Sequence, residues 1–216
     1  MNVYFDTEFT GLVPRTSLIS VGMVDENGKK FYAEFTDYDK SMCSDWIKEN
    51  VLDNLILKNL NDGFEENYIW NEDLKEAGIV DHIEDMFVRG SSDYICDKLK
   101  RWFSEYENER IQLVSDVCHY DMTLLCNLFG GAFNLPDNVN PACYDINMDL
   151  MNYFADDTSG DYYNCEDETM SKAFDSSREK FIVKVLKKKL PEGAKHNSLY
   201  DAMIVKLIYE GLRNGR

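Results

Sequence analysis

The spacing of apolar residues in the first part of the chain predicts β-strands rather than helices. Residues 2–5 form a short β-branched and aromatic run, and two longer apolar runs follow at 18–25 and 30–36. Glu26-Asn27-Gly28 separates the second run from the third. Asn-Gly is the strongest short signal for a hairpin turn. We therefore predict three consecutive antiparallel strands.

Helical periodicity replaces this pattern further along. Apolar residues recur with a helical period over four stretches, and a short strand-like run at 111–115 lies between the second and the third. Residues 61–90 have a mixed pattern that leaves their secondary structure open. The predicted helices cover residues 44–60, 92–107, 121–129 and 197–212. This order favours an α/β fold, in which a mixed sheet of about five strands, the first three antiparallel, is flanked by helices.

The composition is that of a globular domain. Of the 216 residues, 44% are hydrophobic and 13% aromatic, which is enough for a substantial core in a single domain spanning 1–216. The six cysteines include no Cys-x-x-Cys pair and no secretory signal is recognisable, so we expect reduced thiols in a cytoplasmic protein. No apolar run reaches the length of about 18–20 residues that spans a bilayer, so no membrane partner is expected.

Charge is distributed unevenly along the chain. Residues 137–175 hold ten acidic residues against one basic, whereas 178–195 hold seven basic residues against two acidic. We interpret the acidic segment as a solvated loop or insertion, with a lid or a partner-binding face as the alternative. The net charge of −17 would repel a long polyanion. Either the partner is not nucleic acid, or it is contacted locally, through metal ions and a small basic patch.

Several acidic residues stand where a metal site could use them. Asp6 and Glu8 follow the first strand two positions apart, so they project from one face. Asp121 opens a predicted helix, and Asp201 lies at the start of the last helix, five residues after His196. Carboxylates held close together repel unless a cation lies between them, and hard oxygen ligands suit Mg²⁺ or Mn²⁺.

This set of residues suits phosphodiester hydrolysis. Two divalent ions about 3.5–4 Å apart can stabilise the attacking and the leaving oxygen of an in-line displacement, and several carboxylates are needed to hold them. A neutral histidine can take the proton of the attacking water near neutral pH. The expected ligands of two Mg²⁺ or Mn²⁺ ions are Asp6, Glu8, Asp121 and Asp201, and the expected general base is His196.

Three blocks of the sequence resemble the motifs of the DEDDh 3′→5′ exonucleases, the family that includes oligoribonuclease, RNase T and proofreading exonuclease domains. Phe5-Asp-Thr-Glu-Phe-Thr-Gly-Leu12 resembles the first motif, and Tyr120-Asp-Met-Thr-Leu-Leu125 resembles the second. His196 and Asp201 have the spacing of the third motif. The tyrosine branch of the superfamily places Tyr where this chain has Asn197, so the histidine branch fits. The resemblance implies an RNase H-like fold.

The second block departs from the family pattern in one respect. Many members carry His-Asn a few residues before the Asp of this motif, and Asp116-Val117 occupies that place here. Asp116 is therefore a rival to Asp121 as the second-motif ligand. We favour Asp121 because it lies in the matching run of aromatic, Asp and apolar residues.

By resemblance, we expect a 3′→5′ exonuclease that releases 5′-mononucleotides from single-stranded 3′ ends or short oligonucleotides, with RNA slightly favoured over DNA. A pocket lined by Phe9, Thr10, Gly11 and Leu12 would hold the terminal nucleotide. The basic stretch before His196 could guide the strand, or could be a solvated face. Several members of the family are homodimers, but no residue here indicates a dimer face.

Two other functions remain open from the sequence. One is a metal-dependent phosphodiesterase acting on small nucleotides or dinucleotides. The other is a non-catalytic RNase H-like protein that binds a partner through the acidic segment at 137–175. The complete set of acids together with His196 argues against the second, because a binding protein has no need of all five residues.

Overall fold

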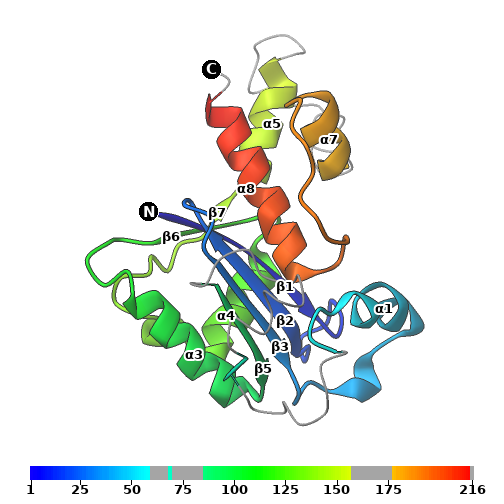
Figure 1. The fold of residues 1–216 in the computed structure, drawn as a ribbon, viewed down its shortest axis with the longest axis vertical. Helices are drawn as coiled ribbons and strands as arrows, with labels where there is room; N and C mark the ends of the chain where they lie inside the picture. Colours follow the sequence, from blue (N-terminus) through cyan, green and yellow to red (C-terminus); the bar gives the residue numbers. More distant parts are fainter. Residues whose placement is uncertain (59–67, 70–84, 157–176, 215–216) are drawn as a thin grey trace.

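The computed structural model describes residues 1–58, 68–69, 85–156 and 177–214, and these residues contain a seven-stranded sheet with helices on both faces (Figure 1). Across the sheet the strand order is β4-β5-β3-β2-β1-β6-β7. The strands are β1 (Asn2–Phe9), β2 (Leu18–Asp25), β3 (Lys30–Phe35), β4 (Tyr68–Ile69), β5 (Met86–Gly90), β6 (Gln112–Ser115) and β7 (Tyr144–Asp145).

The sheet is mixed, and its first three strands are antiparallel as predicted. β1 pairs with β2 and β2 with β3 in antiparallel fashion, whereas β6 runs parallel to β1 and β5 runs parallel to β3. At the β2–β3 hairpin the carboxylate of Asp25 accepts hydrogen bonds from the backbone of Asn27 and Lys29, both at 2.8 Å. Gly28 has a φ of 98°, which favours glycine. The predicted α/β fold class is confirmed, with two more strands than expected.

Two groups of helices cover the two faces of the sheet (Figure 1). One core cluster joins α3 (Ser92–Ser104) and α4 (His119–Leu128) to the sheet, and another joins α8 (Ser198–Asn214) to the opposite face together with α5 and α7. The remaining helices are α1 (Asp45–Asn50), α5 (Asn147–Asp156) and α7 (Arg178–Lys184). None of these described helices is long and apolar enough to cross a lipid bilayer.

Alternation along β1 decides which residues face which helices. Val3 and Phe5 belong to the cluster with α3 and α4, whereas Tyr4 belongs to the cluster with α8. Because side chains alternate along a strand, Asp6 and Glu8 continue the face of Tyr4. Both carboxylates therefore lie on the side of the sheet that α8 covers.

Gly22 lets α8 approach this face closely. It pairs with Asp6 in the β1–β2 ladder, and a Cβ at Gly22 would lie 2.3 Å from the backbone nitrogen of Leu199. Two positions earlier, the hydroxyls of Ser20 and Ser198 share a hydrogen bond of 2.9 Å. A glycine opposite Asp6 thus places the first turn of α8, which carries Asp201, directly over the acidic part of β1.

The prediction of one helix over 44–60 is correct only for its first turns. α1 begins after the N-cap Ser44 as expected but ends at Asn50, and a short 3₁₀ turn at Leu52–Asn54 follows. Leu57 is fully buried, and its backbone N–H donates to the carboxylate of Glu34 on β3 (2.7 Å). This contact with the sheet outweighs the helical period of the local sequence.

The structure adds to two segments that the sequence left open or described only in part. Residues 61–90 gave a mixed pattern, and β5 lies within this range and pairs with β3. Most of the acidic segment at 137–175 was expected to be a solvated loop or insertion, and its described first part contains β7 and α5, with Ile146 and Leu150 fully buried. The remainder of that segment, 157–176, lies outside the described residues.

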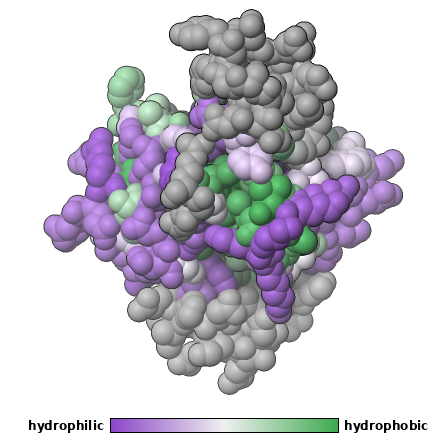
Figure 2. Space-filling model, turned by 90° about the horizontal axis from the view of Figure 1, so that it is seen from above, coloured by the Kyte–Doolittle hydropathy of each residue, from purple (hydrophilic) through white to green (hydrophobic). Residues whose placement is uncertain are grey.

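The end of the molecule that carries α5 and α7 presents a mostly hydrophilic surface. Seen from this end, hydrophilic residues lie on either side of a central apolar area (Figure 2). The N-terminal part of α8 lies nearer the middle of the molecule, where the helix packs on β1 and β2 (Figure 1).

Candidate active site

Three carboxylates meet where α8 covers β1. β1 extends to Phe9 rather than ending at residue 5, so Asp6 and Glu8 lie within the strand and project together. Asp201, in the first turn of α8, reaches the same place because Gly22 lets the backbone of Ser198 and Leu199 lie directly against the sheet. Oxygen atoms of Glu8 and Asp201 and a ring nitrogen of His196 all lie within 4.8 Å of one another. The structure thus brings together four of the five predicted catalytic residues from two distant parts of the chain.

Asp121 reaches the same region from the other side of β1. It is buried in the first turn of α4, where its Oδ1 accepts hydrogen bonds from the hydroxyl (2.5 Å) and the backbone N–H (3.2 Å) of Thr7. The hydroxyl of Ser115, at the end of β6, donates to Oδ2 (3.3 Å). Thr7 lies between Asp6 and Glu8, so these bonds fix Asp121 beside the other carboxylates.

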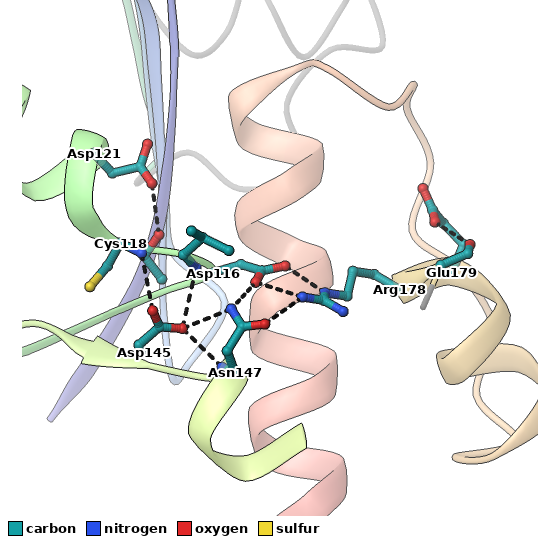
Figure 3. A network of polar contacts seen from close by, with 10 residues as sticks. Asp116, Cys118, Asp121, Asp145, Asn147, Arg178 and Glu179 are labelled. Atoms are coloured by element: carbon teal, nitrogen blue, oxygen red, sulfur yellow. Dashed lines mark hydrogen bonds and ion pairs between the residues drawn. The ribbon is translucent and has the colours of Figure 1, made fainter. Parts of the chain in front are cut away.

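Asp116, the rival of Asp121, is engaged in a different network (Figure 3). Its carboxylate accepts hydrogen bonds from Arg178 Nε (2.6 Å) and from the side-chain amide of Asn147 (2.6 Å). Asp145 accepts hydrogen bonds from the backbone of Val117 and Cys118, at 3.2 and 3.3 Å, next to the start of α4. This network ties α7 and α5 to the loop between β6 and α4, and it occupies the Asp116 carboxylate with a cation of the chain itself.

The carboxylates of the site raise one another's pKa. Burial, followed by the negative charges of Asp121, Asp201 and Glu8, raises the pKa of Asp6 well above its usual range. Burial and the charges of Asp201 and Asp121 raise the pKa of Glu8 to about 8. Such mutual repulsion in a buried site is the condition that a bound divalent cation relieves.

The pKa values of Asp121 and Asp201 are raised less than that of Asp6, because hydrogen bonds to these two carboxylates oppose the effect of burial. Burial raises the pKa of Asp121 to about 6, opposed by its hydrogen bonds from Thr7 and Ser115. Burial likewise raises the pKa of Asp201 to about 7, opposed by the backbone N–H of His196, which donates to Asp201 Oδ2 (2.9 Å). Oxygen donors of this kind fit Mg²⁺ or Mn²⁺.

His196 is held in a backbone conformation that non-glycine residues adopt infrequently. Its φ is 64°. Asn54 stabilises this conformation from one side, because its side-chain amide donates to the carbonyl of Lys195 (2.9 Å). Asn197 stabilises it from the other, donating to the carbonyl of Asn54 (2.9 Å) and accepting at Oδ1 from the backbone of Leu199 (3.1 Å) at the start of α8.

The ring of His196 packs against an exposed tryptophan. The ring centroids of His196 and Trp46 are 4.9 Å apart at an interplanar angle of 73°, and Trp46 is 53% exposed. Burial and the positive charge of Lys195 lower the pKa of His196. A neutral imidazole near neutral pH can accept a proton, so the ring is suited to general-base work.

The residues predicted to line a substrate pocket have different environments. Leu12 is 74% exposed, and the ring of Phe9 stacks on that of Tyr120 with centroids 5.5 Å apart. Thr10 is buried, and its hydroxyl bonds within its own loop to the hydroxyl of Thr16 (3.2 Å). Gly11 has a φ of 153° and has open space where a side chain would be.

Sequence reasoning missed several residues that build this site. Thr7 and Ser115 fix Asp121, and their only signal in the sequence is their position within or beside the matched blocks. Trp46 was counted with the apolar positions of a helix, but most of its surface is exposed. Arg178 gave no signal because its partner Asp116 is 62 positions away.

Comparison with known proteins gives partial matches. No family model matches this sequence. A stretch of 55 residues is 36% identical to the 3′-5′ exoribonuclease of Mycobacterium tuberculosis, in both the CDC 1551 / Oshkosh and the ATCC 25618 / H37Rv strains. This stretch covers 26% of the chain and 33% of each relative, so the match spans about a third of the length of the curated relatives. These relatives are of the enzyme class that the three motifs predicted.

A solved structure is also similar to the chain. It is that of the Neurospora crassa Pan2 catalytic unit, with its protease and nuclease domains, at a TM-score of 0.47 and 15% identity. The similarity covers 99% of this chain and 27% of that one.

Proposed function

We propose that this chain is a divalent-metal-dependent 3′→5′ exonuclease that releases 5′-mononucleotides from single-stranded nucleic acid, with RNA favoured over DNA. The observation that carries the proposal is the convergence of Asp6, Glu8, Asp121 and Asp201 beside His196. These residues come from β1, α4 and α8, and their carboxylates repel one another in the absence of a cation. The match to a 3′-5′ exoribonuclease supports the same activity.

The acidic residues would hold two Mg²⁺ or Mn²⁺ ions. Asp6 is central to this set of ligands, because the charges of Asp121, Asp201 and Glu8 all act on its buried carboxylate. When bound, such ions supply positive charge to the attacking and the leaving oxygen of an in-line phosphoryl displacement. Asp116 is not proposed as a ligand, since Arg178 already neutralises it.

His196 would move the proton in the reaction. It would take a proton from the attacking water while the water oxygen forms a bond to the scissile phosphorus. The bond from phosphorus to the 3′-oxygen of the preceding nucleotide breaks, so the released product is a 5′-mononucleotide. Asn54 and Asn197 would keep the imidazole in place, because their hydrogen bonds hold the backbone on both sides of it.

Exposed apolar side chains beside the carboxylates would bind the terminal nucleotide. Leu12 and Trp46 present apolar surface to solvent, and Phe9 is backed by the ring of Tyr120. Bases stack on aromatic rings with little dependence on sequence. We propose that Phe9, Leu12 and Trp46 contact the terminal base and sugar, and that Thr10 and Gly11 shape the loop between them.

The direction of degradation tests the proposal. Two batches of one single-stranded RNA oligomer, labelled at the 5′ or at the 3′ end, would be incubated with protein and Mg²⁺ or Mn²⁺, with the matching DNA oligomers alongside. We expect a shortening ladder from the 5′ label and immediate mononucleotide from the 3′ label, with RNA degraded faster.

Other outcomes would identify another function. Internal cuts, or mononucleotide as the first product from the 5′ label, would contradict the exonuclease direction. If all four oligomers stayed intact while a dinucleotide was hydrolysed, the chain would be a small-nucleotide phosphodiesterase. If the dinucleotide also stayed intact, a non-catalytic binding protein would be favoured.

A further inference from the structure

A basic segment leads directly into the candidate active site. Residues 184–195, here called the lysine arm, connect α7 to His196. The arm has one acidic residue, Glu192, within a chain whose net charge is −17. Its five lysines are Lys184, Lys187, Lys188, Lys189 and Lys195.

The lysine arm runs antiparallel along α8 and ends at the N-terminus of that helix (Figure 1). Leu186 lies against Gly211 near the C-terminal end of α8, where a Cβ on the glycine would be 2.5 Å from the leucine side chain. Gly193 lies against Tyr200 at the other end of the helix. With a rise of about 1.5 Å per residue, the arm follows α8 over roughly 16 Å.

Leucines hold the lysine arm to the protein and leave its lysines outward. Leu186 and Leu190 pack on the core cluster of α8, whereas Lys184, Lys187, Lys189 and Lys195 are exposed. Lys187 adopts a left-handed backbone conformation with a φ of 55°, which turns the chain locally. The arm therefore exposes four lysines to solvent along its length.

The arm lysines lack the ion pairs with carboxylates that five other lysines of the described chain form. Within the described residues, none of the five forms an ion pair, although the chain is rich in acids. Lysines that do lie within 4 Å of a carboxylate are Lys29, Lys48, Lys58, Lys100 and Lys206. In a chain of net charge −17, a row of unneutralised lysines beside a phosphodiester site indicates an anionic partner.

We propose that the lysine arm binds the backbone phosphates of a single nucleic-acid strand on the 5′ side of the scissile bond. This proposal rests on the proposed exonuclease function of the carboxylate site. Stacked nucleotides rise about 3.4 Å each, so an arm of about 16 Å would follow roughly four or five of them. The enzyme would then bind oligomers of that length or longer more tightly than dinucleotides, through contacts that do not depend on base sequence.

The test compares a substrate that is long enough to reach the lysine arm with one that is too short to reach it. The variant Lys187→Glu/Lys189→Glu would be assayed on a single-stranded RNA ten-mer and on a dinucleotide. Lys100→Glu/Arg101→Glu makes the same change of charge on exposed residues of α3, across the sheet from the arm, and serves as the control. Lys187→Arg/Lys189→Arg keeps the charge and should behave as the wild type.

We expect the arm variant to raise KM for the ten-mer at least about tenfold, because each lost phosphate contact weakens salt-dependent binding. Its kcat and its kinetics on the dinucleotide should stay within about twofold of the control. Equal losses on both substrates, or an unchanged KM for the ten-mer, would overturn the role of the arm.

Binding measured without turnover separates this proposal from the proposed function. Fluorescence anisotropy of a 5′-labelled ten-mer with EDTA present reports affinity even if the chain hydrolyses nothing. Changing Lys187 and Lys189 to Gln should lower the slope of log Kd against log salt by about one for each lysine. An unchanged slope would contradict the arm proposal, whereas a lowered slope without any hydrolysis would contradict only the exonuclease.

Discussion

Gly22 and Leu199 are in backbone contact: a Cβ on the glycine would lie 2.3 Å from the amide nitrogen of Leu199. Gly22 pairs with Asp6 in the sheet, and Leu199 lies two residues before Asp201. The distance between the first-motif and third-motif carboxylates thus depends on the absence of one side chain. The glycine lies outside all three motif blocks, yet it brings two of them together.

Gly22→Ala should therefore reduce both stability and activity. The added methyl group must push α8 away from β2, and overpacking of this kind typically costs about 1–3 kcal/mol. Misplacing catalytic groups by about 1 Å can lower turnover on the order of a hundredfold. Thermal unfolding and single-turnover hydrolysis would measure the two effects. Ser20→Ala, which removes only the bond to Ser198, is the control and should cost about 1 kcal/mol with little loss of turnover.

Asp121 and Asp116 should respond differently to the same substitution. Asp121→Asn should lower turnover at least about a hundredfold, because the carboxylate that Thr7 holds beside Asp6 would lose its charge. Asp116→Asn should mainly lower stability, by about 2 kcal/mol, since it breaks the ion pair with Arg178. Turnover and thermal unfolding of both variants check this. An active Asp121→Asn protein beside an inactive Asp116→Asn protein would transfer the ligand role to Asp116.

His196→Ala should separate proton transfer from metal binding. A ring nitrogen of His196 lies within 4.8 Å of oxygens of Glu8 and Asp201, so the residue could in principle act as a ligand or as a base. As the base, its loss should lower kcat at least about a hundredfold and leave the Mn²⁺ affinity nearly unchanged. Isothermal titration with Mn²⁺ and steady-state kinetics measure the two quantities. A large loss of Mn²⁺ affinity, comparable to that of Asp201→Asn, would identify His196 as a ligand.

The metal-free protein should lose stability as pH rises from about 4 to 8. In the unfolded chain the site carboxylates titrate near pH 4. In the folded chain the pKa of Asp121 is raised to about 6, that of Asp201 to about 7 and that of Glu8 to about 8. The folded state therefore binds more protons over this interval, and the free energy of unfolding falls as pH rises.

Thermal unfolding in EDTA at several pH values measures this dependence. Asp201→Asn should show a shallower fall than the wild type because one shifted group is gone. Adding Mg²⁺ or Mn²⁺ should restore more stability at pH 8 than at pH 5, since the ions bind deprotonated carboxylates. Identical pH profiles for the wild type and Asp201→Asn would contradict the shifted pKa of Asp201.

Sequence patterns predicted the features in which local chemistry agrees with the final structure. The Asn27-Gly28 turn and the two apolar runs beside it predicted the β2–β3 hairpin, because glycine and the Asp25 carboxylate satisfy that turn locally. The spacing of Asp6 and Glu8 predicted a shared face, since strand alternation depends on nothing distant. The sequence also predicted α8, because the helical period of its apolar residues is long and regular.

Features that depend on distant partners could not be predicted. The helical period over 44–60 continued past the point where Leu57 donates to Glu34 on β3, and no local signal marks that bond. β5 is short, and its pairing with β3 and β4, which no local signal marks, makes it a strand of the sheet. Whether Trp46 faces the core or His196 likewise depends on where α8 begins.

The most direct test of the account is single-turnover hydrolysis of a 5′-labelled RNA oligomer by wild-type and Asp6→Asn protein, each with Mg²⁺ and with EDTA. The wild type with Mg²⁺ should shorten the oligomer from its 3′ end, and EDTA should stop it. Asp6→Asn should be at least about a hundredfold slower with Mg²⁺, because Asp6 lies among all the other carboxylates of the site. Equal rates in EDTA, or an Asp6→Asn protein as active as the wild type, would contradict a metal-dependent exonuclease built on these residues.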